Sequence, residues 1–264
     1  MKQIITTLFI VIIFSSCNNA VKEQPVTQLQ KIPVQEKEMK DAIDKYPDSM
    51  LLRETLIQYF ENNGNYDLAI AETNKVLQND SANLLFLNKK ADLFYLNYDT
   101  LSAIKIYEKS IEIYPDPKII ISLGICYAQT QNPNALIMAD ALLIGKKSHA
   151  EKEAFFIKGL YYSYINQKQK AIPFFDKCLT LDYTYMQGYL EKGVALYDLN
   201  KYEEALLVFD KAVTVQNKFD EGYYWMGRCF EKLNKPNDAV ESYKTALLFN
   251  PDFVEAKDAL AKLK

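Results

Sequence analysis

Few residues in this chain are of types that do chemistry, and they form no catalytic set. His149 is the single histidine among 264 residues, which excludes a two-histidine zinc motif and leaves one candidate imidazole base. Glu203 and Glu204 are adjacent carboxylates, but they fall at the predicted start of a helix, where acidic side chains favour the helix dipole. The sequence has no glycine-rich run of the kind that cradles phosphate groups. We therefore expect no enzyme activity, no cofactor and no metal site.

The four cysteines are of two kinds. Cys126, Cys178 and Cys229 lie in helical patterns without close CxxC spacing, so we expect neither a disulfide framework nor a metal cluster. Cys178 stands at the repeat position that Ala212 holds further along, which predicts a small buried side chain. Cys17 differs from these three, because it follows an apolar run at the start of the chain.

The pattern of residues 1–17 indicates a signal peptide. Lys2 precedes an apolar run that is well short of the roughly 20 residues needed to span a bilayer. Small residues then lead into Cys17, which resembles the lipobox of bacterial lipoproteins, although Phe14 and Ser16 stand where that family prefers leucine and a smaller residue. The resemblance implies that the Cys17 thiol is lipidated after cleavage just before it, giving a membrane anchor. The alternative is an ordinary secretory signal with an incidental cysteine.

Residues 18–35 are mostly polar, include Pro25 and Pro33, and predict a flexible tether that spans about 25 Å on average. The whole chain has 31 basic and 34 acidic residues, a formal charge of -3. This balance provides no basic field for nucleic acid phosphates or for an anionic bilayer. We therefore expect no nucleic acid partner, and membrane attachment through the lipid alone.

Beyond the tether the chain repeats itself at an offset of 34 residues. The repeated small and aromatic positions are Gly193 and Gly227, Ala205 and Ala239, Phe209 and Tyr243, and Ala212 and Ala246. Each copy indicates two amphipathic helices joined by a short polar turn, and a pair this small must stack on its neighbours to bury its apolar face. This pattern resembles the tetratricopeptide repeat (TPR) family.

The resemblance implies an all-α fold, a right-handed superhelix or α-solenoid that occupies residues 36–264. The helix-ending positions step by 34 residues and are Pro47, Ser81, Pro115, His149, Tyr183, Asn217 and Pro251. They predict six helix pairs, at 50–83, 84–117, 118–151, 152–185, 186–219 and 220–253. A helix at 36–46 is expected to cover the first end, and residues 254–264 to cap the last.

The third repeat departs furthest from this pattern. The small position of the second helices is held by Ala69, Ala103, Ile137, Ala171, Ala205 and Ala239. The close-approach position of the first helices is held by Ile57, Ala91, Ile125, Gly159, Gly193 and Gly227. With Ile125, Ile137 and Ala141 where small or aromatic residues belong, the third repeat predicts a locally repacked core, and a hinge or special site is the alternative.

In the TPR family the first helices line the concave side, where a peptide or partner helix binds. Residues four and seven or eight apart share one face of a helix. Carrying one such face through three repeats predicts a groove of Phe156, Leu160, Tyr164, Leu190, Val194, Tyr197, Tyr224 and Arg228. Nearer the tether the same face is polar and acidic, with Glu54, Gln58, Glu61, Asn88, Asp92 and Tyr95. The alternative is that the predicted groove residues simply fill the inner wall.

These resemblances imply a non-catalytic, lipid-anchored scaffold that binds a protein or peptide within a complex of the bacterial cell envelope, with the outer membrane as the expected location. A glycan- or ligand-capturing lipoprotein is the alternative function. Trp225, the single tryptophan, lies two residues from Gly227, which favours packing over stacking on a sugar. The partner and the oligomeric state stay open.

Overall fold

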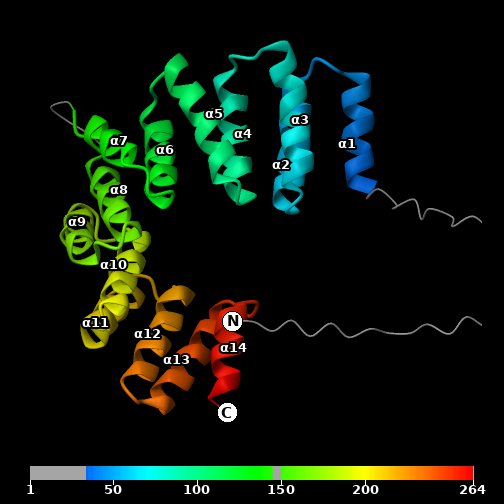
Figure 1. Cartoon of the computed structure of the whole chain (residues 1–264). Coiled ribbons are helices and arrows are strands. Elements are labelled where there is room, and N and C mark those ends of the chain that lie inside the picture. Colours follow the sequence, from blue (N-terminus) through cyan, green and yellow to red (C-terminus); the bar gives the residue numbers. More distant parts are fainter. Residues whose placement is uncertain (1–33, 145–149, 264) are drawn as a thin grey trace, which may run out of the picture.

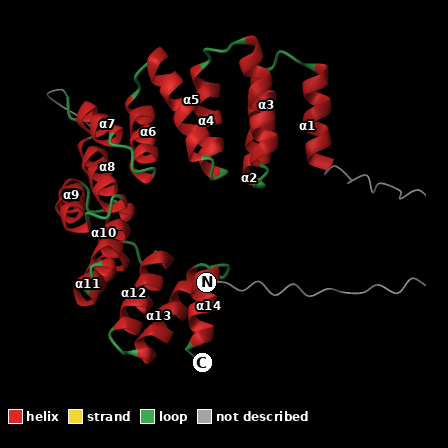
Figure 2. Cartoon of the chain, in the orientation of Figure 1, coloured by secondary structure: helices red, strands yellow, loops and turns green. Residues whose placement is uncertain are grey.

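The computed structural model describes residues 34–144 and 150–263, and within them it contains helices and no strands (Figure 2). The helices are α1 (Val34–Lys45), α2 (Met50–Asn62), α3 (Tyr66–Asn79), α4 (Leu84–Leu96), α5 (Thr100–Ile113), α6 (Pro117–Gln129), α7 (Asn134–Leu142), α8 (Glu151–Tyr164), α9 (Lys168–Leu181), α10 (Met186–Asp198), α11 (Tyr202–Val215), α12 (Asp220–Lys232), α13 (Pro236–Phe249) and α14 (Val254–Lys262). Since α1 begins at Val34, the last two residues of the expected tether are helical. Cys17 and His149 lie outside the described residues.

The helices stack one after another into an open arc, which confirms the expected α-solenoid (Figure 1). Figure 1 shows α6 and α10 on the inner side of the arc, with α7, α9 and α11 on its outer side. We call the surface formed by the first helices of the pairs, α2, α4, α6, α8, α10 and α12, the inner wall. No helix in the described ranges is long and apolar enough to cross a membrane.

Local sequence fixes where the helices start and turn. Asn83 and Asp99 cap α4 and α5, accepting backbone N–H groups at 3.3 and 3.0 Å. The turns inside the last three pairs use left-handed residues at equivalent positions, namely Asn166 (φ 59°), Asn200 (φ 59°) and Asn234 (φ 56°). Asparagine tolerates this conformation better than most residues, so the chain reverses at the same place in each repeat.

The first helix of the third repeat is displaced by one residue from the 34-residue register. Its left-handed turn residue is Gln131, one position before the residue equivalent to Asn166. The close approach is correspondingly made at Gly124, where a Cβ atom would lie 3.2 Å from the Cβ atom of Met138. The expectation that Ile125 occupies the close-approach position is therefore wrong, because the displacement places Gly124 there instead.

The second helix of this repeat is rotated as well. Ala135 and Ala139 are fully buried in α7, whereas Ile137 is 60% exposed. Two residues correspond to about 200° around a helix, so α7 turns a different face to its neighbours than the equivalent helices do. Ile137 therefore does not take the small buried position that the register assigned to it, and the core of the third repeat is locally repacked.

In the last three complete repeats an aromatic ring packs directly over a glycine. The pairs are Gly159 with Phe175, Gly193 with Phe209, and Gly227 with Tyr243. All three aromatic side chains are fully buried. The absence of a Cβ atom allows each ring to fill the space between the two helices of its repeat.

Candidate functional site on the inner wall

A hollow of about 500 Å³ opens in the inner wall where α8, α10 and α12 meet. We call it the α8–α10 hollow. Its lining consists of Ser163, Tyr164, Asn166, Lys168, Leu190, Glu191, Val194, Asp198 and Trp225. Three of them, Tyr164, Leu190 and Val194, belong to the predicted groove. Tyr164 is 41% exposed, so its ring offers apolar surface to a ligand.

Three other predicted groove residues are part of the core. Phe156, Leu160 and Tyr224 are 5%, 2% and 9% exposed, so the prediction that they form an open contact surface is wrong. Phe156 and Tyr224 are each covered by the aromatic residue that precedes the first helix of the next repeat. The ring of Tyr185 lies 5.1 Å from that of Phe156, and the ring of Phe253 lies 5.0 Å from that of Tyr224, centroid to centroid. For these three residues the packing alternative is correct.

The two remaining predicted residues, Arg228 and Tyr197, contact each other. Arg228 Nη1 donates to the hydroxyl of Tyr224 at 2.9 Å and Nη2 to that of Tyr197 at 3.3 Å. The guanidinium carbon also lies 5.6 Å from the centroid of the Tyr197 ring and 5.8 Å from that of Trp225. Arg228 has no ion pair with a carboxylate of the described residues. Its charge is thus held by hydroxyls and ring faces.

Charged groups in the α8–α10 hollow are unevenly paired. Lys168 forms an ion pair with Asp198 at 2.8 Å and also donates to Ser163 Oγ at 3.1 Å. Glu191 has no hydrogen bond or ion pair with the part of the chain that the structure describes. Burial raises the pKa of the Glu191 carboxyl to about 7; Lys168 opposes this rise, while the carboxylates of Asp198 and Glu221 add to it. Near neutral pH the Glu191 carboxyl can therefore either donate or accept a hydrogen bond.

Replacing Glu191 with glutamine is expected to change how stability depends on pH. An unfolded glutamate has a pKa of about 4.3. Between that pH and about 7 the folded protein binds more protons than the unfolded chain, so the free energy of unfolding falls as pH rises and levels off above pH 7. Relative to wild type, Glu191→Gln should therefore gain about 2–3 kcal/mol between pH 4.5 and pH 8, measured by urea denaturation.

The matched control is Glu203→Gln, an exposed residue on α11. Its profile gives the change in stability that loss of one exposed negative charge produces by itself. If the Glu191→Gln and wild-type profiles run parallel from pH 4.5 to pH 8, Glu191 does not titrate with a raised pKa.

The predicted groove includes the apolar residues of the α8–α10 hollow but not its charged residues. Glu191, Lys168 and Asp198 were not among the predicted site residues. A signal was present for Glu191, because it lies next to Leu190 and three residues before Val194, on the edge of the predicted groove face. The Lys168–Asp198 pair joins helices α9 and α10, so it depends on packing that helical periodicity alone does not specify.

Comparisons with known proteins agree with this architecture. A family model described as Tetratricopeptide repeat matches residues 152–185, 187–219 and 220–253, which confirms the resemblance for these repeats. A solved tetratricopeptide repeat protein from Parabacteroides merdae is similar at a TM-score of 0.72 and 19% identity, over 86% of this chain and 90% of that one. No curated protein sequence matches the chain.

Two further solved structures are similar in fold. PilW, a type IV pilus biogenesis factor, has a TM-score of 0.62 and 16% identity, over 79% of this chain and 97% of that one. A chain of the APC/C hetero-tetramer Cut9-Hcn1 has a TM-score of 0.59 and 16% identity, over 86% of this chain and 45% of that one. At these identities the likeness concerns the fold alone.

Proposed function

Because the chain carries tetratricopeptide repeats in an α-solenoid, we propose that it is a non-catalytic scaffold that holds a segment of a partner protein on its inner wall. The α8–α10 hollow is the observation that carries the proposal. It combines accessible apolar surface at Tyr164, Leu190 and Val194 with the unpaired Glu191 carboxyl. Apolar anchors supply most of the binding energy of such contacts, and polar groups fix the register of the bound segment.

The double variant Tyr164→Ser/Val194→Ser tests this function. We expect it to lower recovery of the cross-linked partner from native membranes by about tenfold or more, because it removes apolar contact surface from the hollow. Its melting temperature should stay within about 2 °C of wild type, since both side chains are at least partly exposed.

The control is Leu207→Ser/Leu248→Ser, which removes two apolar side chains that are 70% and 74% exposed on α11 and α13. This control should recover the partner like wild type. Equal recovery with both double variants, or recovery of the chain itself and nothing else, would contradict partner binding in the α8–α10 hollow.

We further propose that the scaffold is anchored to a bacterial envelope membrane through a lipid on Cys17, the outer membrane being the expected one. The support is the sequence of residues 1–17 followed by a polar stretch. Cys17→Ala should move the protein from the membrane pellet to the supernatant after a high-salt wash, as measured by immunoblotting. Cys178→Ala is the control and should stay in the pellet, because its buried thiol occupies an alanine position of the repeat. Persistence of Cys17→Ala in the pellet would exclude lipid anchoring at this residue.

Glycan capture is the weaker alternative because the ring of Trp225 is already surrounded. It is stacked on Phe209 with an interplanar angle of 12°, and the rings of Tyr197 and Tyr224 meet it edge-on. The Arg228 guanidinium lies 5.8 Å from its centroid. These contacts occupy Trp225, so the single tryptophan offers no stacking platform to a sugar, and Tyr164 is the open ring of the hollow.

A further inference from the structure

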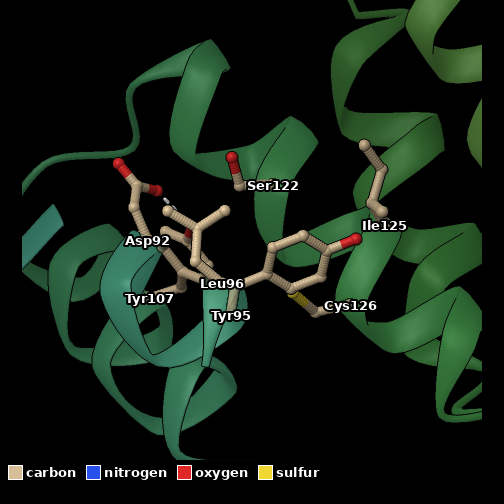
Figure 3. Close-up of a pocket in the computed structure, with 7 residues that line it drawn as sticks. All are labelled: Asp92, Tyr95, Leu96, Tyr107, Ser122, Ile125 and Cys126. Carbon is tan, nitrogen blue, oxygen red and sulfur yellow. Dashed lines mark hydrogen bonds between the residues drawn. The ribbon is translucent and has the colours of Figure 1, made fainter. Parts of the chain in front are cut away.

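A second hollow of about 250 Å³ lies in the inner wall between α4 and α6, with α5 contributing to its lining (Figure 3). We call it the α4–α6 hollow. Its lining consists of Asp92, Tyr95, Leu96, Tyr107, Ser122, Ile125 and Cys126. Four of these residues have structural equivalents in the α8–α10 hollow. Tyr95 and Leu96 stand 68 positions before Ser163 and Tyr164, and, with the one-residue displacement of α6, Ser122 and Ile125 stand 69 positions before Glu191 and Val194. The two hollows are therefore equivalent places on one wall, two repeats apart.

The Asp92 carboxylate gives this hollow a negative charge that no cation neutralises directly. The buried hydroxyl of Tyr107 donates a hydrogen bond to Asp92 Oδ1, which fixes the carboxylate in place. Lys89, the nearest candidate cation along α4, is bound to Glu61 at 3.0 Å. Within residues 34–144 and 150–263, Asp92 forms no ion pair, and its Oδ2 atom accepts no hydrogen bond from the protein.

The rest of the hollow is mostly apolar and small. Figure 3 shows the Tyr95 ring between the Asp92–Tyr107 pair and Ile125, with Leu96 beside it. The Tyr95 hydroxyl accepts a hydrogen bond from Gln129 at 2.9 Å, so the ring is held in position. At about 250 Å³ the space is smaller than the roughly 300–1,000 Å³ typical of pockets for drug-sized ligands, and it fits one side chain better than a whole small molecule.

The charge of Asp92, which has no ion pair among the described residues, favours a cationic ligand over a neutral one. The surrounding side chains raise the pKa of Asp92 by desolvation, and the Tyr107 hydrogen bond together with the charge of Lys89 opposes this rise. The Asp92 side chain is exposed overall, so these neighbours remove only part of its water. A partly desolvated carboxylate without an ion pair is stabilised by a positive charge placed beside it.

We propose that the α4–α6 hollow binds a lysine side chain of the partner segment, with its ammonium on Asp92 and its methylene stem against Leu96 and Ile125. This inference rests on the proposed scaffold function and adds the chemistry of one side chain of the partner. Lysine fits better than arginine because Tyr107 already occupies one acceptor site of Asp92 Oδ1, which obstructs two parallel guanidinium hydrogen bonds more than a single ammonium contact. The apolar lining matches a long aliphatic stem.

The probe that tests this subsite is a ten-residue lysine peptide, compared with the same peptide acetylated on every side chain. Binding to the full chain is measured by isothermal titration calorimetry near 0.15 M salt, where interactions between distant charges are largely screened. Asp92→Asn should weaken binding of the lysine peptide by about tenfold, because it removes the charge while keeping an oxygen that accepts from Tyr107. The acetylated peptide should bind at least about tenfold more weakly to wild type.

The matched control is Glu112→Gln on α5, an exposed carboxylate whose loss changes the net charge equally, from -3 to -2. It should change the affinity less than about twofold. If both variants weaken binding alike, or if the acetylated peptide binds as well as the charged one, the subsite is overturned. If Asp92→Asn folds poorly, Leu96→Trp tests the same subsite. Leu96 is 40% exposed, so an indole ring in its place covers the hollow and should weaken binding of the lysine peptide.

The outcomes separate this inference from the scaffold function. If partner recovery depends on Tyr164 and Val194 but neither Asp92→Asn nor Leu96→Trp weakens lysine binding, the scaffold stands and the lysine subsite is wrong. If lysine binding depends on Asp92 while no partner is recovered at all, the subsite stands and the α8–α10 proposal is wrong.

Discussion

Replacing Phe209 with alanine is expected to destabilise the protein by about 3–5 kcal/mol, the cost of removing a fully buried aromatic side chain and leaving a cavity. The ring lies against Gly193 and is stacked on Trp225 at 6.1 Å between centroids. Neither neighbour can fill the space: glycine has no side chain, and Trp225 is held by Tyr197 and Tyr224. In a repeat array each unit is stabilised by its neighbours, so the loss also weakens the α10–α12 part of the inner wall.

Urea denaturation of the purified protein, with thermal melting beside it, measures this effect. A loss of this size should lower the melting temperature by roughly 10 °C. The matched control is Leu207→Ala, two residues away on the same helix and 70% exposed, which should change stability by no more than about 0.5 kcal/mol. A cost below about 1 kcal/mol for Phe209→Ala would show that the glycine–aromatic packing is not the core of the repeat.

The regular repeats could be predicted from the sequence because one structural unit recurs at one spacing. The pairing of Gly193 with Phe209, and of Gly227 with Tyr243, follows from the 34-residue offset and appears in the structure as direct contact. Where the offset fails, the prediction fails with it. In the third repeat α6 and its turn are shifted by one residue, so Gly124 takes the close approach in place of Ile125.

The inner wall was harder to predict because helical periodicity gives the direction of a side chain but not what covers it. Phe156 and Tyr224 point along the predicted face, yet aromatic residues of the following connections lie over them. Those covering residues, Tyr185 and Phe253, are themselves spaced by multiples of 34 residues, so a signal existed in the sequence. Tyr164 lacks such a cover and is the aromatic residue of that face that stays open.

Replacing Gly193 with alanine is the second substitution with a large expected effect. Whether it raises or lowers the free energy of unfolding shows whether the ring of Phe209 needs the space at this glycine. Within a helix, glycine to alanine normally stabilises by up to about 1 kcal/mol, because alanine restricts the unfolded chain. Here the added Cβ atom would lie 2.5 Å from Phe209 Cε1 and closer still to Cζ, well inside van der Waals contact. We expect a net loss of about 2–3 kcal/mol in the free energy of unfolding, since a fully buried ring cannot move away without displacing its neighbours.

Gly188 in the same helix separates overpacking from the general effect of the substitution. A Cβ atom at Gly188 would lie 3.0 Å from Leu179 Cδ2, the far end of a flexible side chain, so Gly188→Ala should be close to neutral. Combining Gly193→Ala with Phe209→Leu should recover part of the loss, because the smaller side chain vacates the space that the new methyl group needs. If the double variant is as unstable as the sum of its single changes, the two residues do not share that space, and the glycine would instead be required for another contact of α10.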